Sequence, residues 1–337
     1  MCIGCAGGRR FRSFAQTEIL RFIVANYGSR HSGMLLAHLE SLAQSHPGAE
    51  VSVYWQDMPG RLIGAVRAAF PAVEFVETQF DFAGDAIARI SSKVLCWAQA
   101  AEEHTGDLVF ADGDTLVRRD LAGFFKADAD VIFTTKPENV PLNTGVILTR
   151  GDAAPFMRAW RDATTRILQT PELFAQANDS SLPYGGTDQM SLYQMLGYER
   201  DRALYTMECK GRSVRLRAEK CARLNETNSR PLVEEICVVH YKAGWQQILL
   251  NGRPFSQWRP REASWEMLSF FLETFATGLA RVNVATGLAM TAADFGIRWP
   301  WYWQAGKFSA TRYAAWRMRA ALERGWLLAT GRGRPRM

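Results

Sequence analysis

The sequence contains no apolar run that approaches the roughly 20 residues a helix needs to span a bilayer. It also has no N-terminal apolar stretch ending in small residues, although Arg9, Arg10 and Arg12 stand near that end, so no secretory signal is predicted. No internal repeat is found. We therefore expect a non-repetitive protein that stays in the cytoplasm.

Cysteine is scarce, and its spacing predicts no zinc finger. Cys2 and Cys5 form one C-x-x-C pair, and no second pair follows at zinc-finger spacing. Cys96 falls in a helical pattern and Cys237 in a strand pattern, where we expect buried free thiols. The six cysteines thus agree with a cytoplasmic protein.

Acidic residues are few near the C-terminus. Residues 291–337 carry nine basic and two acidic side chains, a net charge of +7, whereas the whole chain carries +6. The tryptophans among these arginines are Trp299, Trp301, Trp303, Trp316 and Trp326. Such a segment suits peripheral contact with the anionic inner face of a membrane. A helix packed on the rest of the protein is the alternative, and both stay open. Nucleic acid is not expected as a partner, because no recognised binding motif accompanies the charge.

The composition itself is that of an ordinary globular protein, with 47% apolar and 22% charged residues. Helices are predicted near residues 31–46, 60–69, 90–104, 152–169 and 188–196. Strands are predicted near residues 19–25, 51–55, 73–77, 107–111, 131–135, 145–149, 214–217 and 236–240, with a short strand through Tyr205. In the first half, strands alternate with crossover helices, which is typical of a mostly parallel sheet covered on both faces.

After residue 120 the rhythm changes. The strands at 131–135 and 145–149 are only about 10 residues apart, too few for a comfortable helical crossover. The first residues show no periodicity, and the pattern beyond residue 260 is helical and rich in aromatics. We therefore expect a loose N-terminus (1–16), a main α/β domain (17–260), and a helical, basic, Trp-rich extension (261–337).

One acidic motif stands where a ligand is expected. Asp112-Gly113-Asp114 follows the predicted strand 107–111, and open α/β sheets bind ligands outside the carboxyl ends of their strands. Two carboxylates flanking a glycine can take one hard divalent cation and leave positions free for diphosphate oxygens. A turn with helix-capping aspartates is the alternative.

A second pair with the same pattern is placed differently. Asp128-Ala129-Asp130 comes just before the strand at 131–135, at the opposite edge of the sheet. We therefore expect a solvated turn there. Position, and not the string of letters, distinguishes the two motifs.

Three further motifs follow along the chain. Asn143-Thr144-Gly145 leads into an apolar strand, where a strand start with an Asn turn is an equal alternative. After Gly185-Gly186, Thr187 or Asp188 is expected to cap a helix. His240 ends the last clear strand beside Lys242, which suits a metal ligand and a phosphate partner, although a structural histidine is an equal alternative. The other histidines (His31, His38, His46 and His104) fall in or at the ends of helices, where a surface or capping role is the default.

In this order the motifs resemble those of GT-A nucleotide-sugar glycosyltransferases, closest to the retaining enzymes of glycosyltransferase family 8. The resemblance covers about residues 19–250. It implies an α/β, Rossmann-like mixed sheet forming a GT-A catalytic domain, followed by the C-terminal helical extension. It further implies metal-dependent transfer of a hexose from a nucleotide-sugar, UDP-sugar being favoured, to a glycan or lipid-linked acceptor with retention, as in polysaccharide or lipopolysaccharide biosynthesis.

The resemblance also implies roles for single residues. Asp112, Asp114 and His240 would bind Mn²⁺ (or Mg²⁺) bridging the two phosphates, with Asp112 also near the ribose of the donor. Asp188 and Gln189 would be the catalytic residues, on the side of the site where the sugar and the acceptor bind. The other donor-binding residues implied are Ala25, Asn26 and Tyr27 at the nucleobase, and Lys93, Asn143 and Lys242 around the sugar and diphosphate.

The histidine motif departs from the family pattern. The family follows its histidine with a glycine, then a lysine, a proline and a tryptophan, whereas His240 is followed by Tyr-Lys-Ala-Gly-Trp. The phosphate role of Lys242 is therefore left open. For the chemistry itself, a divalent ion would neutralise the leaving diphosphate, and Asp188 could stabilise positive charge on the sugar, as a nucleophile or as a neighbouring charge.

Two other functions stay open. Val109-Phe-Ala-Asp112-Gly-Asp114-Thr-Leu looks superficially like the aspartate nucleophile motif of haloacid-dehalogenase-type phosphohydrolases. That motif has one more residue before its Thr-Leu and usually follows a chain's first strand. The non-enzymatic alternative is a nucleotide-sugar-binding protein without turnover.

Overall fold

The computed structural model describes residues 19–80, 91–227, 232, 234–242, 244–252, 265–298 and 322. The predicted loose N-terminus at 1–16, the domain boundary near 260 and most of the basic segment 291–337 lie outside these residues. Among the described residues, no helix is both long and apolar enough to cross a membrane.

Strands and helices alternate through the first half of the chain, as predicted. The strands are β1 (Arg21–Tyr27), β2 (Glu50–Gln56), β3 (Val73–Glu77), β4 (Leu108–Asp112), β5 (Thr115–Val117), β6 (Val131–Thr135), β7 (Leu142–Thr149), β8 (Leu204–Cys209), β9 (Arg212–Lys220) and β10 (Val238–His240). The helices are α1 (Ser32–Ser45), α2 (Gly60–Ala69), α4 (Lys93–Glu103), α5 (Ala154–Gln169), α6 (Pro171–Asn178), α7 (Thr187–Leu196), α8 (Cys221–Leu224), α9 (Gly244–Leu249) and α10 (Trp265–Thr286). Two short 3-10 helices, η1 (Phe124–Lys126) and η3 (Ala293–Phe295), complete the described elements.

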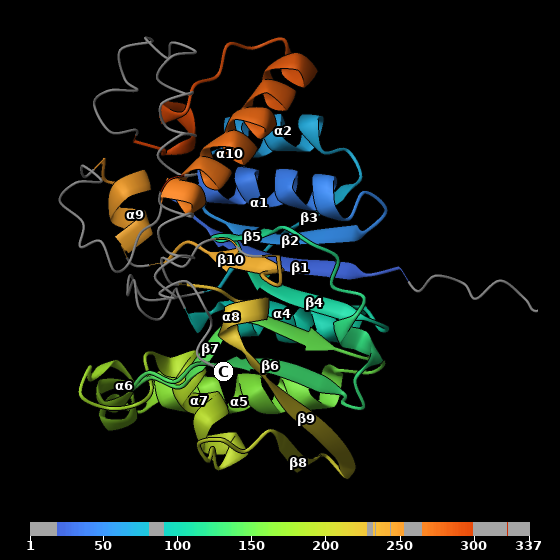
Figure 1. Ribbon diagram of the computed structural model, residues 1–337, viewed down its shortest axis with the longest axis vertical. Helices are drawn as coiled ribbons and strands as arrows, with labels where there is room; N and C mark the ends of the chain where they lie inside the picture. Colours follow the sequence, from blue (N-terminus) through green and yellow to red (C-terminus); the bar gives the residue numbers. More distant parts are fainter. Residues whose placement is uncertain are drawn as a thin grey trace, which may run out of the picture.

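Eight strands form one mixed sheet in the order β3-β2-β1-β4-β7-β6-β9-β8 (Figure 1). β3, β2, β1 and β4 are parallel, β7 is antiparallel to both of its neighbours, β6 and β9 are parallel, and β8 returns antiparallel along the edge. β5 and β10 form a separate antiparallel pair. The predicted α/β mixed sheet is therefore confirmed.

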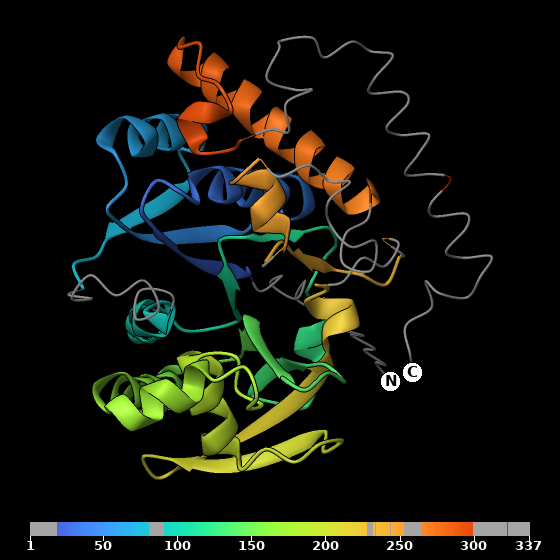
Figure 2. The same cartoon turned by 90° about the vertical axis from the view of Figure 1, so that its left-hand side faces the viewer.

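The central strands of the sheet are buried on both faces because they are apolar on both sides, whereas β3, β8 and β9, at or next to the edges of the sheet, are partly exposed. Phe22 and Val24 of β1 enter one core with α1, α2 and α10, whereas Ile23 enters a second core with α4, α5 and α7. This is the near-continuous apolar pattern expected of strands covered by helices on each side. The turned view in Figure 2 shows α1, α2 and α10 together at one end of the molecule, with α5 and α7 toward the other.

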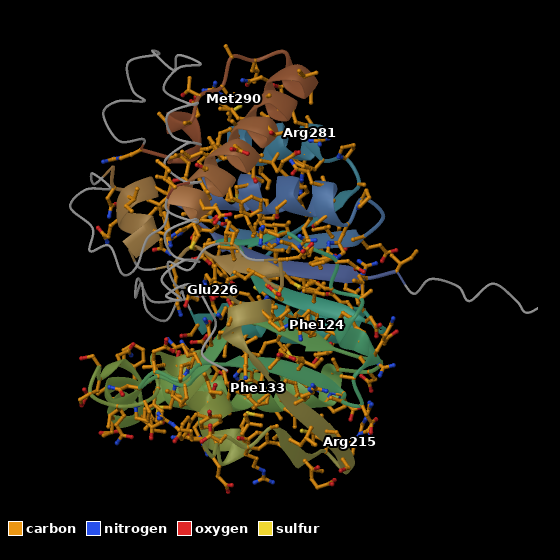
Figure 3. All side chains as sticks on the ribbon, viewed as in Figure 1. Phe124, Phe133, Arg215, Glu226, Arg281 and Met290 are labelled. Atoms are coloured by element: carbon orange, nitrogen blue, oxygen red, sulfur yellow. The ribbon has the colours of Figure 1, made fainter. Side chains whose placement is uncertain are left out.

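Helix α10 belongs to the first core even though it comes late in the chain. Phe271 and Phe275 of α10 are fully buried, and Arg281 of α10 bonds the buried Glu40 carboxylate of α1 at 2.8 Å. Figure 3 shows Arg281 on the upper part of the molecule and Arg215 of β9 near the bottom. The first helix after residue 260 is thus packed onto α1 and α2.

Several boundaries differ from those predicted. β7 begins at Leu142 and not near 145, because Leu142 and Asn143 pair with Thr135 and Thr134 of β6. Asn143 therefore lies inside a strand and does not open one. Helix α6 was not predicted from the sequence; it begins directly after α5, with Pro171 in its first turn.

The directions of the strands bring distant segments to one edge of the sheet. β1, β4, β6 and β9 all point the same way, so their carboxyl ends lie along one edge together with the start of the antiparallel β7. Asp112, the last residue of β4, lies on this edge, whereas Asp128 precedes β6 at the other edge and is 86% exposed. Asp128 is thus solvated, as predicted, whereas Asp130 is half-buried and accepts from Arg215 N at 2.8 Å.

Candidate active site

The acidic motif is positioned by β4 and by a close approach to β1. Asp112 pairs with Ala25 in the β1–β4 register, and the chain then turns through Gly113 to Asp114. A Cβ on Gly113 would lie 3.3 Å from the Ala25 carbonyl oxygen, which is tighter than an ordinary contact. A glycine between the two aspartates therefore lets the motif lie against the end of β1.

His240, at the end of β10, faces both aspartates. Its Nε2 lies 3.1 Å from Asp114 Oδ1 and 3.7 Å from Asp112 Oδ2. One ligand atom from each of the three residues lies within 4.8 Å of the other two. The structure thus brings together, from β4 and β10, the three residues that the sequence analysis selected as metal ligands.

Asn225 orients the His240 ring. Its Oδ1 lies 3.0 Å from His240 Nδ1, and its Nδ2 donates to Thr134 Oγ1 at 3.0 Å. Because the amide nitrogen is used on Thr134, the Asn225 oxygen accepts from Nδ1–H, and the ring is held so that Nε2 faces the carboxylates. Metal-ligating histidines are commonly held in this way by a partner on the other nitrogen.

Gly145 of β7 makes room for this ring. A Cβ there would lie 2.4 Å from His240 Cε1 and 2.5 Å from Nδ1. No larger residue fits unless the histidine moves. Nothing in the sequence indicated a role for Asn225, and Gly145 was expected only to lead into a strand.

Lys93 connects the acidic motif to the start of α7. Its Nζ lies 2.8 Å from Asp112 Oδ1, 3.0 Å from Asp112 Oδ2 and 3.1 Å from Asp188 Oδ2. Thr144 donates to the same Asp188 oxygen. Each Asp112 oxygen keeps a further lone pair, so the Lys93 contact does not use up the acceptor capacity of that carboxylate.

Asp188 is not a helix cap, so the expected cap at Thr187 or Asp188 is wrong. The N-cap of α7 is Gly186, whose positive φ of 138° favours glycine, and no side chain caps the helix. Asp188 is 4% exposed and turns to Lys93 and Thr144, while its carbonyl accepts from Trp160 Nε1 at 3.0 Å. Its side chain is therefore free to serve the site.

Burial and charge pairing set the protonation of these groups. Burial raises the pKa of Asp112 even though Lys93 and His240 oppose the rise. Burial also acts against the ionised Asp114, but the neighbouring His240 lowers its pKa below the usual range. Burial disfavours the charge on Lys93, but the charges of Asp112 and Asp188 raise its pKa. Burial also disfavours the charge on Asp188, but the charge of Lys93 lowers its pKa. The site thus holds a buried cation between two carboxylates.

The residues predicted at the nucleobase lie at the end of β1, on the same edge. Ala25 is half-buried beside Asp112. The Asn26 amide donates to Met58 Sδ at 3.1 Å, and the Tyr27 hydroxyl lies 2.8 Å from Cys96 Sγ. Cys96 is a buried free thiol, as predicted, and so is Cys237.

Asn143 and Gln189 carry buried polar atoms without a partner among the described residues. Asn143 is 2% exposed; its Oδ1 accepts from Gly145 N, and its Nδ2 is unsatisfied. Gln189 donates from Nε2 to the Gly185 carbonyl at 3.1 Å, and its Oε1 is unsatisfied. Buried groups of this kind usually have a partner, so a bound molecule at this edge would satisfy them.

Lys242 follows His240 and is half-buried. Burial lowers its pKa, Lys136 beyond the end of β6 lowers it further, and Asp114 and Asp112 act in the opposite direction. The residue therefore lies close to the acidic motif, among both like and unlike charges.

His38 was wrongly expected to have a surface or capping role, whereas His31 stands at the N-cap position of α1, as expected. His38 of α1 is fully buried, with its Nδ1 2.6 Å from the carbonyl of Thr115, directly after the acidic motif. Burial lowers the pKa of His31, and the charge of Asp114 partly offsets this. Gln246 of α9 donates to Asp114 Oδ2 at 3.0 Å. Helical spacing alone gave no sign of these contacts.

No family model and no curated protein sequence matches this chain. It is similar in structure to glycosyltransferase GlyE of Streptococcus pneumoniae TIGR4, at 13% identity and a TM-score of 0.49, over 79% of this chain and 63% of that one. It is also similar to galactosyltransferase LgtC solved with donor and acceptor sugar analogs, at 15% identity and a TM-score of 0.45, over 85% of this chain and 99% of that one. A third similar structure is mouse xyloside xylosyltransferase 1 in its apo form, at 11% identity and a TM-score of 0.38, over 66% and 97%.

The chain thus spans less than two thirds of the length of GlyE. These likenesses to glycosyltransferases have TM-scores below 0.5 and identities of 15% or less. The roles of the residues in this chain therefore rest on the geometry of the site.

Proposed function

We propose that this chain is a metal-dependent glycosyltransferase of the GT-A, family 8 type, which moves a hexose from a UDP-sugar or related nucleotide-sugar to a glycan or lipid-linked acceptor with retention. One observation carries the proposal. Asp112, Asp114 and His240 converge at the ligand-binding edge of a mixed α/β sheet, with an Asp188–Lys93 ion pair directly beside them.

The donor set fits a divalent ion. Two carboxylates and the Nε2 of an imidazole can serve as ligands at once, and Asn225 already orients the ring so that Nε2 faces the carboxylates. Carboxylates suit Mg²⁺ and Mn²⁺, and the imidazole favours Mn²⁺, because Mg²⁺ takes oxygen ligands. A bound ion would act as a Lewis acid on the diphosphate leaving group.

Lys93 and Asp188 supply opposite charges next to that position. The Lys93 ammonium lies where negative charge gathers, and Asp188, held ionised by Lys93 and Thr144, is placed to stabilise positive charge on the donor sugar. Asn143 and Gln189 would orient the sugar through their unsatisfied amide atoms. Ala25, Asn26 and Tyr27 would lie at the nucleobase, and Lys242 at the diphosphate. The protein would act in the cytoplasm, with the basic segment 291–337 at the inner face of the membrane.

Turnover of a panel of nucleotide-sugars, with and without Mn²⁺, tests this function. Asp112→Ala and Asp114→Ala should each abolish metal-dependent release of the nucleotide diphosphate while the protein still folds, which a cooperative thermal unfolding transition checks. Asp128→Ala is the matched control, because it removes an aspartate from the same pattern at the opposite edge, and it should retain full activity.

Two results would overturn the proposal. Full activity in Asp114→Ala would show that Asp114 is not a ligand of the catalytic metal ion. Mg²⁺-dependent phosphatase activity without nucleotide-sugar binding would point to a phosphohydrolase.

A further inference from the structure

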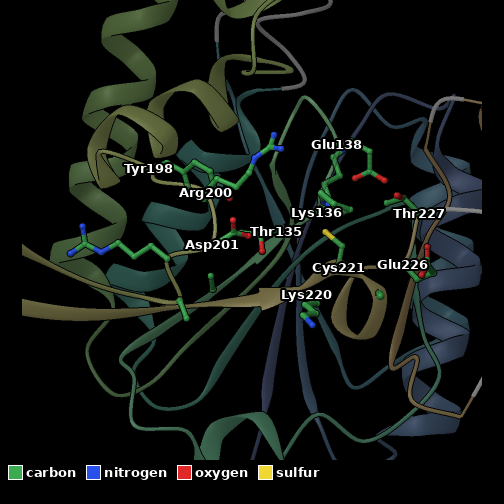
Figure 4. A pocket seen from close by; sticks show the side chains of 15 residues that line it. Thr135, Lys136, Glu138, Tyr198, Arg200, Asp201, Lys220, Cys221, Glu226 and Thr227 are labelled. Carbon is green, nitrogen blue, oxygen red and sulfur yellow. The ribbon is translucent and has the colours of Figure 1, made fainter. Parts of the chain in front are cut away.

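A groove of about 550 Å³ opens at the same edge of the sheet, beyond the ends of β6 and β9. Thr135, Lys220 and the first residues of α8 form one side, and the loop from Tyr198 to Ala203 forms the other. Figure 4 shows the labelled side chains of Lys136, Arg200 and Glu226 around it. No residue of this groove was singled out from the sequence.

The groove adjoins the metal-binding residues. Glu226 lines it, and the Glu226 carbonyl accepts from His240 N at 2.8 Å. Thr135 lines it too, next to Thr134, which accepts from the Asn225 amide that orients His240. The groove is therefore joined to the proposed metal site through Glu226 and Thr135, while Asp112, Asp114 and His240 themselves do not line it.

The sheet order separates the groove from the nucleobase position. Along the edge, β1 comes first, then β4 with Asp112, then β7, and finally β6 and β9. A donor with its base at β1 and its diphosphate at β4 would point its sugar toward the β6–β9 side. The groove is thus where a second substrate meets the sugar, and this step rests on the proposed glycosyltransferase function.

The cations of the groove are largely uncompensated. Lys136, Arg200 and Lys220 make no side-chain ion pair or hydrogen bond to any described residue, whereas Arg202 pairs with Glu199 at 3.5 Å. Carboxylates also line the groove, through Glu138, Asp201 and Glu226. Free ammonium and guanidinium groups bind phosphate or carboxylate, and carboxylates can accept from hydroxyl groups.

Tyr198 adds an aromatic surface to this set of charges. Its ring lies near-parallel to that of Tyr205, at 6.3 Å and 18°, and Tyr193 packs nearby with its ring centroid 5.3 Å away. The ring is therefore held in place by aromatic neighbours and gives the groove a rigid apolar wall.

We propose that this groove is the acceptor site and that it selects a sugar bearing a phosphate or carboxylate group. Lys136 and Arg200 bind the anionic group, the carboxylates accept from sugar hydroxyls, and Tyr198 contacts the sugar ring.

Binding of three probe sugars to the full-length protein tests the inference. In the presence of Mn²⁺ and UDP, glucose 6-phosphate or glucuronate should bind about tenfold more tightly than glucose, the value of one charge-assisted hydrogen bond. Lys136→Ala and Arg200→Ala should each remove most of that preference. Lys126→Ala is the matched control, because Lys126 is an exposed lysine before the amino end of β6, and it should leave the preference unchanged.

Several outcomes would overturn the inference. Equal binding of all three sugars would remove the anionic selection, and inorganic phosphate binding as tightly as glucose 6-phosphate would show an anion site without a sugar. If Lys136→Ala weakens UDP binding as much as sugar binding, the groove serves the donor. Absence of Mn²⁺-dependent UDP binding in the wild type contradicts the proposed function, whereas UDP binding without anionic preference contradicts only this inference.

Discussion

At the scale of single residues, Asn225 determines which nitrogen of His240 faces the two aspartates. Asn225→Leu removes the acceptor for Nδ1–H and should lower Mn²⁺ affinity about 10- to 100-fold, the usual effect of losing such a partner. Asn225→Asp keeps an acceptor oxygen and should stay close to the wild-type affinity. Isothermal titration with Mn²⁺ measures both, and a leucine variant that binds as the wild type does would refute the role of Asn225.

His38 gives the protein a pH dependence of stability. Burial lowers the pKa of this histidine from 6.5 to about 4. Between these values the unfolded chain holds a proton that the folded chain lacks, so stability falls as pH falls from 6.5 toward 4 and is unaffected by His38 above that window. The loss should be on the order of 3 kcal/mol.

Urea unfolding of the wild type and His38→Asn between pH 4 and pH 7 measures this effect. The asparagine amide can still donate to the Thr115 carbonyl but does not titrate. The difference in unfolding free energy between the two proteins should therefore shrink as pH falls. A difference that stays constant over this range would contradict the assignment.

Prediction from the sequence was most successful where a residue's place follows from its own strand. Asp112, Asp114 and His240 could be selected because each lies at or just after the carboxyl end of an apolar run. Such ends gather at one edge of an α/β sheet, and β10 brings His240 to that edge by pairing with β5, just after Asp114. Asn225, the clearance at Gly145 and the buried His38 depend on contacts across 15 to 95 residues of chain. No local periodicity contains that information.

At the scale of elements, the hydrophobic periodicity predicted whether a segment is a helix or a strand better than it predicted where that element begins and ends. The alternation of apolar residues identified β1 to β4 and their crossover helices, because buried strands and amphipathic helices differ in period. The start of β7 was misplaced, since a polar Asn143-Thr144 pair does not look like strand until it is paired with β6. The Thr187–Asp188 cap was wrong because a lysine far away in the sequence engages the aspartate.

Helix α10 contributes to the stability of the sheet's core. Phe271→Ala removes a fully buried ring and should lower the unfolding free energy by about 3–5 kcal/mol. Val284→Ala on the same helix is the control, since Val284 is 86% exposed, and it should change stability by no more than about 0.5 kcal/mol. Chemical denaturation monitored by tryptophan fluorescence measures both, and a Phe271 variant as stable as the Val284 variant would show that α10 is not part of the core.

At the scale of the whole molecule, two cores hold one sheet whose edge collects every group of the site. The end of β1, where we propose that the nucleobase binds, is followed along this edge by the carboxylates of β4, the unsatisfied Asn143 of β7 and the groove beyond β6 and β9. This order would place donor, metal and acceptor in line. Metal binding by the carboxylates at the centre of this edge is therefore the property on which the proposed active site depends.

Direct binding of Mn²⁺, followed by the electron paramagnetic resonance signal of the free ion, tests that centre. The wild type and Asp128→Ala should each bind one Mn²⁺ per chain, more tightly with UDP present, and Asp114→Ala should lose this site. Equal Mn²⁺ affinity in the wild type and Asp114→Ala would contradict the account.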